Sequence, residues 1–195
     1  MGQIILVTGG ARSGKSAFAE HYAAHAAQKH GTSVAYIATS QIYDDEMQQR
    51  VRLHRSRRPA DWTTYEAPYE APEALRKAGE RHGVILFDCI TMFLSNDILQ
   101  YSEEEQQADS FAAHVRARMD DLIHAAQSVD AVTVFVTNEV GTGIVPENRL
   151  YRDMAGLANQ RLAASADKVY LVTCGIPVDI KKLAEDILVW QRPSC

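Results

Sequence analysis

The chain has 195 residues, of which 46% are hydrophobic and 23% are charged, and its formal net charge is −5. This length and composition predict one globular domain over residues 1–195 and exclude a disordered chain. The negative net charge disfavours a broad nucleic-acid surface, so an anionic ligand has to be held by local groups.

The three cysteines indicate a reducing compartment. Cys89, Cys174 and Cys195 are widely spaced and form no C-x-x-C pair, which argues against a disulfide framework and against a zinc site. The first residues do not have the pattern of a secretory signal, and no apolar run reaches the ~18 residues of a membrane span. We expect a cytoplasmic protein with no membrane span and no nucleic-acid partner.

A phosphate-binding loop follows the first predicted strand. Ile4–Thr8 is apolar, and the next eight residues fit G-x-x-x-x-G-K-[ST]. In such a loop the glycines let backbone N–H groups face a phosphate, the lysine adds charge near the β- and γ-phosphates, and the hydroxyl binds Mg²⁺. A helix is predicted over 16–30, so the motif lies between a strand and a helix, as in known phosphate loops. This context favours a phosphate loop over the alternative, a glycine-rich turn without a ligand. The predicted nucleotide-binding residues are Gly9, Gly10, Ala11, Arg12, Ser13, Gly14, Lys15 and Ser16, with Lys15 also catalytic and Ser16 also a metal ligand.

Strand-like runs alternate with helical patterns along the whole chain. The predicted strands are 4–8, 34–39, 62–66, 84–88, 131–137, 168–173 and the edge strand 176–180, and the predicted helices are 16–30, 44–58, 73–82, 103–129 and 150–164. This alternation is typical of an α/β fold with a mostly parallel sheet flanked by helices. With the phosphate loop, it predicts a three-layer P-loop NTPase fold, RecA-like in arrangement.

Polar residues at strand ends are further candidates, because ligands bind outside the carboxyl ends of strands in open α/β sheets. Thr39 and Ser40 end the second strand, Glu66 ends the third and Asp88 ends the fourth, and we assign all four to nucleotide binding. Asp88 follows four apolar residues, as expected of a carboxylate that supports Mg²⁺ or its water shell. The alternative for Asp88 is a cap on the following helix.

The segment 44–58 has an acidic start, a basic end and a stop at Pro59, which together predict a helix. Its apolar stripe, Met47 and Val51, ends at His54. From the residues alone, a packed or solvated His54 is the more frequent case. The other six histidines are expected to be exposed.

In combination, these stretches resemble one family, the bifunctional adenosylcobinamide kinase and adenosylcobinamide-phosphate guanylyltransferase of cobalamin biosynthesis. The resemblance covers nearly the whole chain. Besides the phosphate loop, it rests on 36–40, 44–47, His54, Arg58–Pro59, 88–91, 138–141, 143–146, Arg152–Asp153, Gly156, Asn159 and Gln160.

The resemblance implies a two-step enzyme that uses Mg²⁺, GTP and ATP. Adenosylcobinamide is phosphorylated first, and GMP from GTP is then transferred to adenosylcobinamide phosphate through a guanylylated histidine, giving adenosylcobinamide-GDP. The matching catalytic position here is His54, and Leu53 stands where some relatives carry a second histidine. The resemblance also implies a homotrimer with sites near subunit contacts.

A neutral His54 ring has the chemistry that the second step needs. It attacks the α-phosphorus, pyrophosphate leaves, and one transfer becomes two easier ones. An unperturbed imidazole is largely neutral at cytoplasmic pH, and nearby arginines favour the neutral form and attract phosphates. Arg55 and Arg58 are therefore nucleotide-binding candidates.

Several alternatives stay open. Asn138 and Glu139 shape either the nucleotide pocket or a subunit contact, or Glu139 is a satisfied loop carboxylate. Cys89 is expected to be a small buried residue and not a nucleophile. Two other functions fit the phosphate loop: a single-activity small-molecule kinase in which His54 is structural, and a GTP-binding regulator that performs no transfer.

Overall fold

The computed structural model describes residues 2–41, 59–106, 109–142 and 148–184. All strands in these ranges form one seven-stranded sheet in the order β3-β2-β4-β5-β1-β6-β7. Every neighbouring pair is parallel except β6 and β7. The strands are β1 Gln3–Gly9, β2 Val34–Ala38, β3 Thr63–Glu66, β4 Val84–Asp88, β5 Val132–Asn138, β6 Lys168–Thr173 and β7 Ile176–Asp179.

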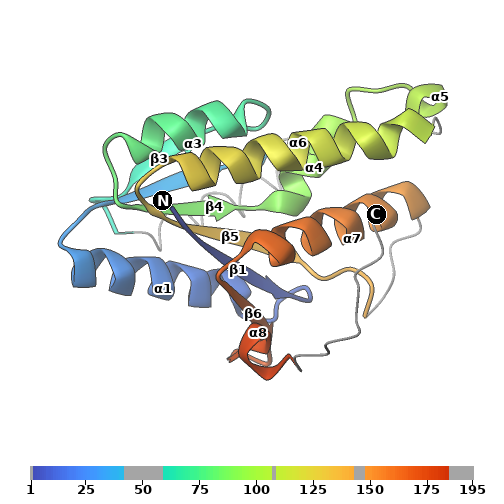
Figure 1. The fold of residues 1–195 in the computed structure, drawn as a ribbon. Coiled ribbons are helices and arrows are strands. Elements are labelled where there is room, and N and C mark those ends of the chain that lie inside the picture. Colours follow the sequence, from blue (N-terminus) through green and yellow to red (C-terminus); the bar gives the residue numbers. More distant parts are fainter. Residues whose placement is uncertain (1, 42–58, 107–108, 143–147, 185–195) are drawn as a thin grey trace.

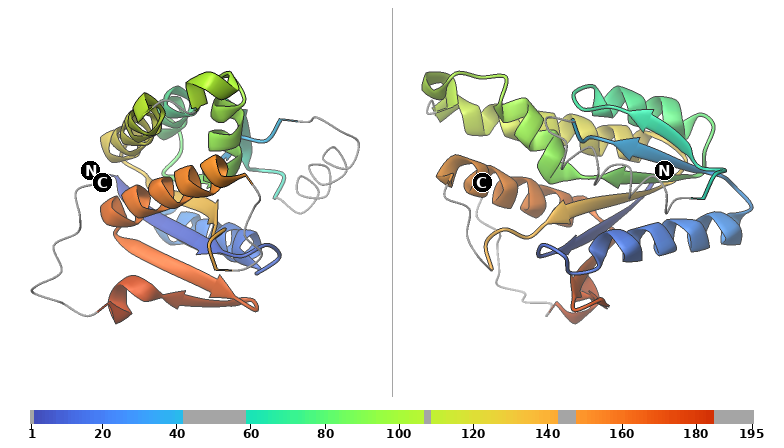
Figure 2. Two further views of the ribbon diagram at one scale, coloured as in Figure 1. Left: turned by 90° about the vertical axis from the view of Figure 1, so that its right-hand side faces the viewer. Right: turned by 180° about the vertical axis from the view of Figure 1, so that it is seen from behind.

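Helices cover both faces of this sheet, with α1 on one side and α3, α6 and α7 on the other (Figures 1 and 2). The helices are α1 Lys15–His30, α3 Ala71–Gly79, α4 Ile90–Ile98, α5 Glu103–Gln106, α6 Asp109–Ser128, α7 Arg149–Ser165 and α8 Ile180–Leu183. The expected three-layer α/β fold, RecA-like with a mostly parallel sheet, is confirmed. Among the described helices, none combines the length and the apolar character that crossing a bilayer requires.

The central strands are apolar on both faces because each face has its own core. Side chains alternate along a strand, so Ile4 and Leu6 pack under α3, α6 and α7, whereas Ile5 and Val7 pack against α1. Position in this alternation therefore tells which layer a side chain of β1, β2 or β4 faces.

The helices differ from the sequence expectation in two places. The helix predicted from residue 73 begins at Ala71, because Pro72 lies in its first turn, where the missing N–H is not needed. The helix predicted over 103–129 is helical wherever it is described, as α5 and α6, and residues 107–108 between them lie outside the described residues. Helix α4 was not expected; seven of its nine residues are buried, so no polar face marks a helical period. The helix predicted over 44–58 lies outside the described residues.

Candidate nucleotide-binding site

The phosphate loop joins β1 to α1 at the carboxyl edge of the sheet. Gly14 precedes the helix with a φ of 94°, and no side chain caps the helix start. The first-turn N–H groups are therefore available to an anion, and the helix dipole favours negative charge there. The phosphate-binding role of residues 9–16 stays a prediction, and it requires a helix start of this kind.

Close contacts explain the glycine at the start of the loop. A Cβ on Gly9 would lie 2.4 Å from the Val172 carbonyl oxygen and 2.6 Å from Ser13 Oγ. A Cβ on Gly10 would meet no atom of the described residues within 4 Å. The loop is also tied to the β6–β7 turn, because Gly175 N donates to the Ser13 carbonyl at 2.8 Å. Packing against β6 and this turn fixes the shape of the loop.

Lys15 is buried, with 8% of its surface exposed. Its Nζ donates to the Gly10 carbonyl at 3.0 Å, so the ammonium is held inside the loop that it serves. Burial lowers the pKa of Lys15, and the proximity of Cys89 and Asp88 opposes that shift. A bound phosphate would add a strong anionic partner to this cation.

Asp88 and Ser16 are the two residues whose oxygen atoms the sequence predicts as cation ligands. Leu86 packs in the core beneath α1, so Asp88, two residues further along β4, faces the same layer as Lys15. Its Oδ2 accepts a hydrogen bond from the Tyr36 hydroxyl at 2.8 Å. Asp88 is not a helix cap, because Cys89 is the N-cap residue of α4 and no side chain caps it.

This donor set fits Mg²⁺ bound together with a nucleotide. Within the described ranges, no three His, Cys, Asp or Glu side chains are grouped to hold a metal by themselves. Magnesium at phosphate sites commonly takes one or two protein ligands and completes its shell with phosphate and water oxygens. The half-buried Ser16 hydroxyl and the half-buried Asp88 carboxylate meet that requirement.

The side chain of Thr39 holds the end of β4. Thr39 is fully buried, and its hydroxyl accepts from Cys89 N at 2.8 Å and donates to the Cys89 carbonyl at 2.9 Å. Asn96 on α4 also donates to the Thr39 carbonyl, at 2.7 Å. By contrast, Ser40 and Glu66 at the ends of β2 and β3 are exposed. Of these strand-end candidates, Thr39 uses its side chain for bonds within the protein that hold β2, β4 and α4 together.

Asn138 belongs to the same scaffold. Its amide donates to Thr91 Oγ1 at 2.9 Å, and Thr91 Oγ1 lies 3.1 Å from Cys89 Sγ. Asn159 on α7 donates to the Asn138 carbonyl at 3.0 Å and accepts from Thr137 at 2.7 Å. These bonds connect β5 with α4 and α7, so the structure assigns Asn138 a positioning role.

Glu139 follows Asn138 and borders the phosphate loop. Its backbone N–H donates to the Gly9 carbonyl at 3.0 Å, and its Oε1 accepts from Gly141 N at 2.6 Å. These contacts favour the alternative of a satisfied loop carboxylate.

Cys89 behaves as a small buried residue, as predicted. Burial, followed by the neighbouring Asp88, raises the pKa of the Cys89 thiol to about 11. The thiol is therefore protonated near neutral pH, which makes it a poor nucleophile.

The predicted His54, Arg55 and Arg58 lie outside the described residues. The expectation that all other histidines are exposed is wrong for two of them. The His82 ring is buried and its Nδ1 lies 2.8 Å from Ser33 Oγ, and His114 Nε2 lies 2.8 Å from Asp97 Oδ2. Both rings have tertiary partners that a single sequence does not reveal. The exposed histidines are His21, His25, His30 and His124.

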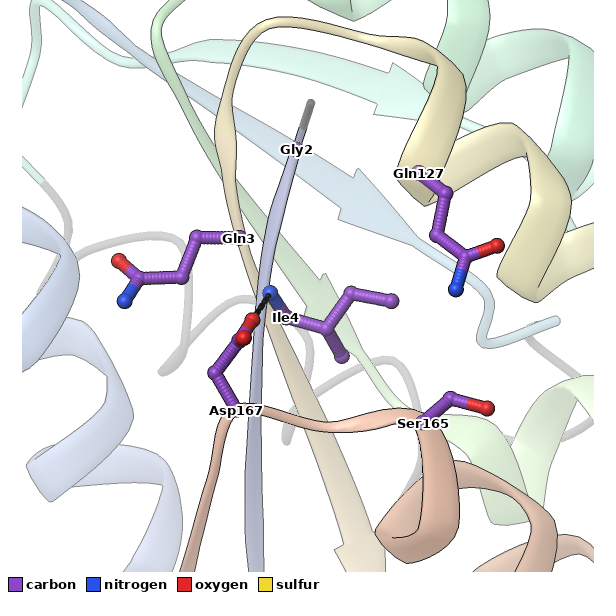
Figure 3. A pocket seen from close by; sticks show the side chains of 6 residues that line it. All are labelled: Gly2, Gln3, Ile4, Gln127, Ser165 and Asp167. Atoms are coloured by element: carbon purple, nitrogen blue, oxygen red, sulfur yellow. Dashed lines mark hydrogen bonds between the residues drawn. The ribbon is translucent and has the colours of Figure 1, made fainter.

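A hollow of about 320 Å³ lies at the opposite, amino-terminal edge of the sheet (Figure 3). Asp167, its one acidic residue, accepts from Ile4 N through Oδ2 at 2.8 Å. This bond fixes the start of β6 against β1, so the carboxylate serves strand pairing. The lining residues are Gly2, Gln3, Ile4, Gln127, Ser165 and Asp167.

Comparison with known proteins gives consistent matches over most of the chain. Residues 5–180 match the family described as "Cobinamide kinase / cobinamide phosphate guanyltransferase". A relative from Escherichia coli K12, "Bifunctional adenosylcobalamin biosynthesis protein CobU", is 44% identical over 91% of this chain and 99% of the relative. The protein of the same name from Salmonella typhimurium is 48% identical over the same shares. CobP from Pseudomonas aeruginosa, also named a bifunctional adenosylcobalamin biosynthesis protein, is 36% identical over 90% of this chain and 96% of the relative.

Two solved structures are similar at low sequence identity. A KaiC-like protein from Pyrococcus horikoshii is 13% identical with a TM-score of 0.45. The flagellar accessory protein FlaH from Methanocaldococcus jannaschii is 15% identical with a TM-score of 0.48. Each alignment covers 87% of this chain and 70% of the other.

Proposed function

Because the chain belongs to the family described as cobinamide kinase / cobinamide phosphate guanyltransferase, we propose that it carries out both reactions at one nucleotide site. ATP or GTP first phosphorylates the aminopropanol hydroxyl of adenosylcobinamide. GMP then passes from GTP to adenosylcobinamide phosphate, giving adenosylcobinamide-GDP. The observation that carries the proposal is the buried Lys15, which faces the same layer as Asp88 beside an uncapped helix start.

In the kinase step the protein holds and orients the triphosphate. The loop N–H groups and Lys15 bind the β- and γ-phosphates, and Ser16 with Asp88 would hold Mg²⁺, which neutralises phosphate charge when bound. The substrate hydroxyl attacks the γ-phosphorus, the bond to the β-phosphate oxygen breaks, and the nucleoside diphosphate leaves. The hydroxyl proton passes to solvent water during this attack.

In the transfer step His54 is the nucleophile of the proposal. One ring nitrogen bonds to the α-phosphorus of GTP as pyrophosphate leaves, and the corrinoid phosphate then attacks that phosphorus and releases the ring. Arg55 and Arg58 would contact the phosphates. In support, the described chain leaves β2 and passes Ser40 and Gln41 at the carboxyl edge, the edge that holds the phosphate loop, before the segment that contains His54 begins.

Labelling with [α-³²P]GTP and Mg²⁺ tests the covalent step. The wild-type chain should take up acid-labile label with release of pyrophosphate, and His54→Asn should lose the label while still transferring γ-phosphate to cobinamide. His124→Asn, on the exposed face of α6, is the matched control and should keep both activities. An unlabelled wild-type chain that still phosphorylates cobinamide would leave a single-activity kinase. Nucleotide binding without either transfer would leave a GTP-binding regulator.

We also propose a homotrimer in the cytoplasm, with each site near a subunit contact. Exposed apolar side chains gather on β7 and α8, including Ile176 at 64% and Leu183 at 70% exposure, and burying them would favour association. The exposed free thiol of Cys174 suits a reducing compartment. Light scattering coupled to size exclusion measures the mass directly, and a monomer at micromolar concentration would contradict the trimer.

A further inference from the structure

Tyr36 lies in the middle of β2 with 2% of its surface exposed. In the parallel register, Tyr36 pairs with Leu86 and Ala38 pairs with Asp88. Tyr36 is therefore the diagonal neighbour of Asp88 on the same face of the sheet, a distance that a long side chain spans. The hydrogen bond from its hydroxyl to Asp88 Oδ2 at 2.8 Å closes that gap.

Core packing alone does not explain the hydroxyl. The Tyr36 ring belongs to the apolar core beneath α1, where phenylalanine would supply the same ring without a polar group. A buried hydroxyl destabilises the fold unless it is hydrogen-bonded, and a bond to an ionised carboxylate is stronger than one between neutral groups. The polar atom of Tyr36 is thus placed where it acts on Asp88.

The hydrogen bond also makes the two carboxylate oxygens unequal. Oδ2 accepts from Tyr36, whereas no hydrogen bond to Oδ1 is found among the described residues. Asp88 lies in the same layer as Lys15, and the charge of Asp88 acts to raise the pKa of Lys15. The bond to Tyr36 restrains rotation of the Asp88 carboxylate, and metal sites use such partners to orient their ligands.

We propose that Tyr36 is a positioning residue for Asp88, which it orients toward the divalent cation that accompanies the nucleotide. The inference rests on the proposed role of Asp88 in that site. It adds a residue outside the phosphate loop and predicts that Tyr36 affects cation binding through the carboxylate.

The test measures metal affinity without turnover. Mn²⁺ is titrated by electron paramagnetic resonance into protein saturated with α,β-methylene-GTP, which does not donate GMP. Tyr36→Phe should weaken Mn²⁺ binding about tenfold, the usual scale for loss of a partner that orients a ligand. Asp88→Ala should weaken it further, and the double variant should match Asp88→Ala alone. Tyr22→Phe, which removes another tyrosine hydroxyl beneath the sheet near Tyr170, should leave the affinity unchanged.

The outcomes separate the two assignments. Weakened binding in Asp88→Ala with normal binding in Tyr36→Phe would overturn the role of Tyr36 and keep that of Asp88. Normal binding in Asp88→Ala would overturn both. A double variant weaker than Asp88→Ala would mean that Tyr36 acts independently of the carboxylate, which also contradicts the proposal. Melting temperatures within a few degrees of wild type identify the variants that retain the fold.

Discussion

The amino-terminal and carboxyl-terminal edges of the sheet have similar polar contacts but different roles. At the amino edge, Asp167 bonds to the backbone of Ile4, and Thr32 Oγ1 accepts from Gly83 N. At the carboxyl edge, Thr39 fixes Cys89 in the same manner, but a buried cation and an uncapped helix start lie beside it. Side-chain hydrogen bonds thus fix strand ends at both edges of the sheet. Only the carboxyl edge adds the buried Lys15 and the start of α1, so the candidate site lies there.

The largest expected effect at the carboxyl edge comes from Lys15→Ala. Removing the buried ammonium should lower kcat/KM by about 10²- to 10³-fold in both steps, because each depends on the phosphates that it holds. Lys29→Ala, in the exposed last turn of α1, is the matched control and should keep full activity. Steady-state assays of phosphate and GMP transfer measure both; a loss confined to one step would mean that the phosphate loop serves only that step.

A smaller effect, on stability, is expected from the close packing around Gly9. Gly9→Ala should destabilise the fold by about 2 kcal/mol, because its Cβ would press on the Val172 carbonyl and on Ser13 in a packed region. Gly10→Ala meets no described atom within 4 Å and should unfold as the wild type does. Urea denaturation followed by circular dichroism compares them, and equal midpoints would contradict the packing account of Gly9.

The smallest effect belongs to the amino edge and depends on pH. Burial, then the charge of Arg81, lowers the pKa of His82 below its usual 6.5. The folded state therefore binds a proton less readily than the unfolded state, so the stabilisation is present above pH 6.5 and is lost as the pH falls toward the folded pKa. The free energy of unfolding should drop from pH 7.5 to 5.5 by more in the wild type than in His82→Gln. An equal drop in both would remove His82 as the cause.

Sequence reasoning reached the parts of the site that are local in the chain. The phosphate loop is contiguous, and Asp88 ends an apolar run, so both are visible without knowledge of strand order. The partners of Asp88 and Cys89 depend on β4 lying between β2 and β5. Bonds such as Tyr36 to Asp88 and Asn138 to Thr91 cross 52 and 47 residues of sequence, and no local pattern encodes them.

Two further misses have a common physical cause. Helix α4 is buried on most sides, so its sequence has no polar period to mark it. The rings of His82 and His114 contact Ser33 and Asp97, which lie 49 and 17 residues away in sequence, so the neighbouring residues do not reveal these partners. In both cases the surroundings of the residues are formed by segments far away in the sequence.

The bond between Gly175 and the Ser13 carbonyl gives the outermost hairpin a place in the architecture of the site. Strands β6 and β7 lie at one edge of the described sheet, and β7 and the following α8 expose apolar side chains. The turn between the two strands nevertheless contacts the predicted phosphate loop. A second subunit that bound these apolar side chains would also restrain the loop through this turn. The affinity between subunits and the affinity for nucleotide would then change together.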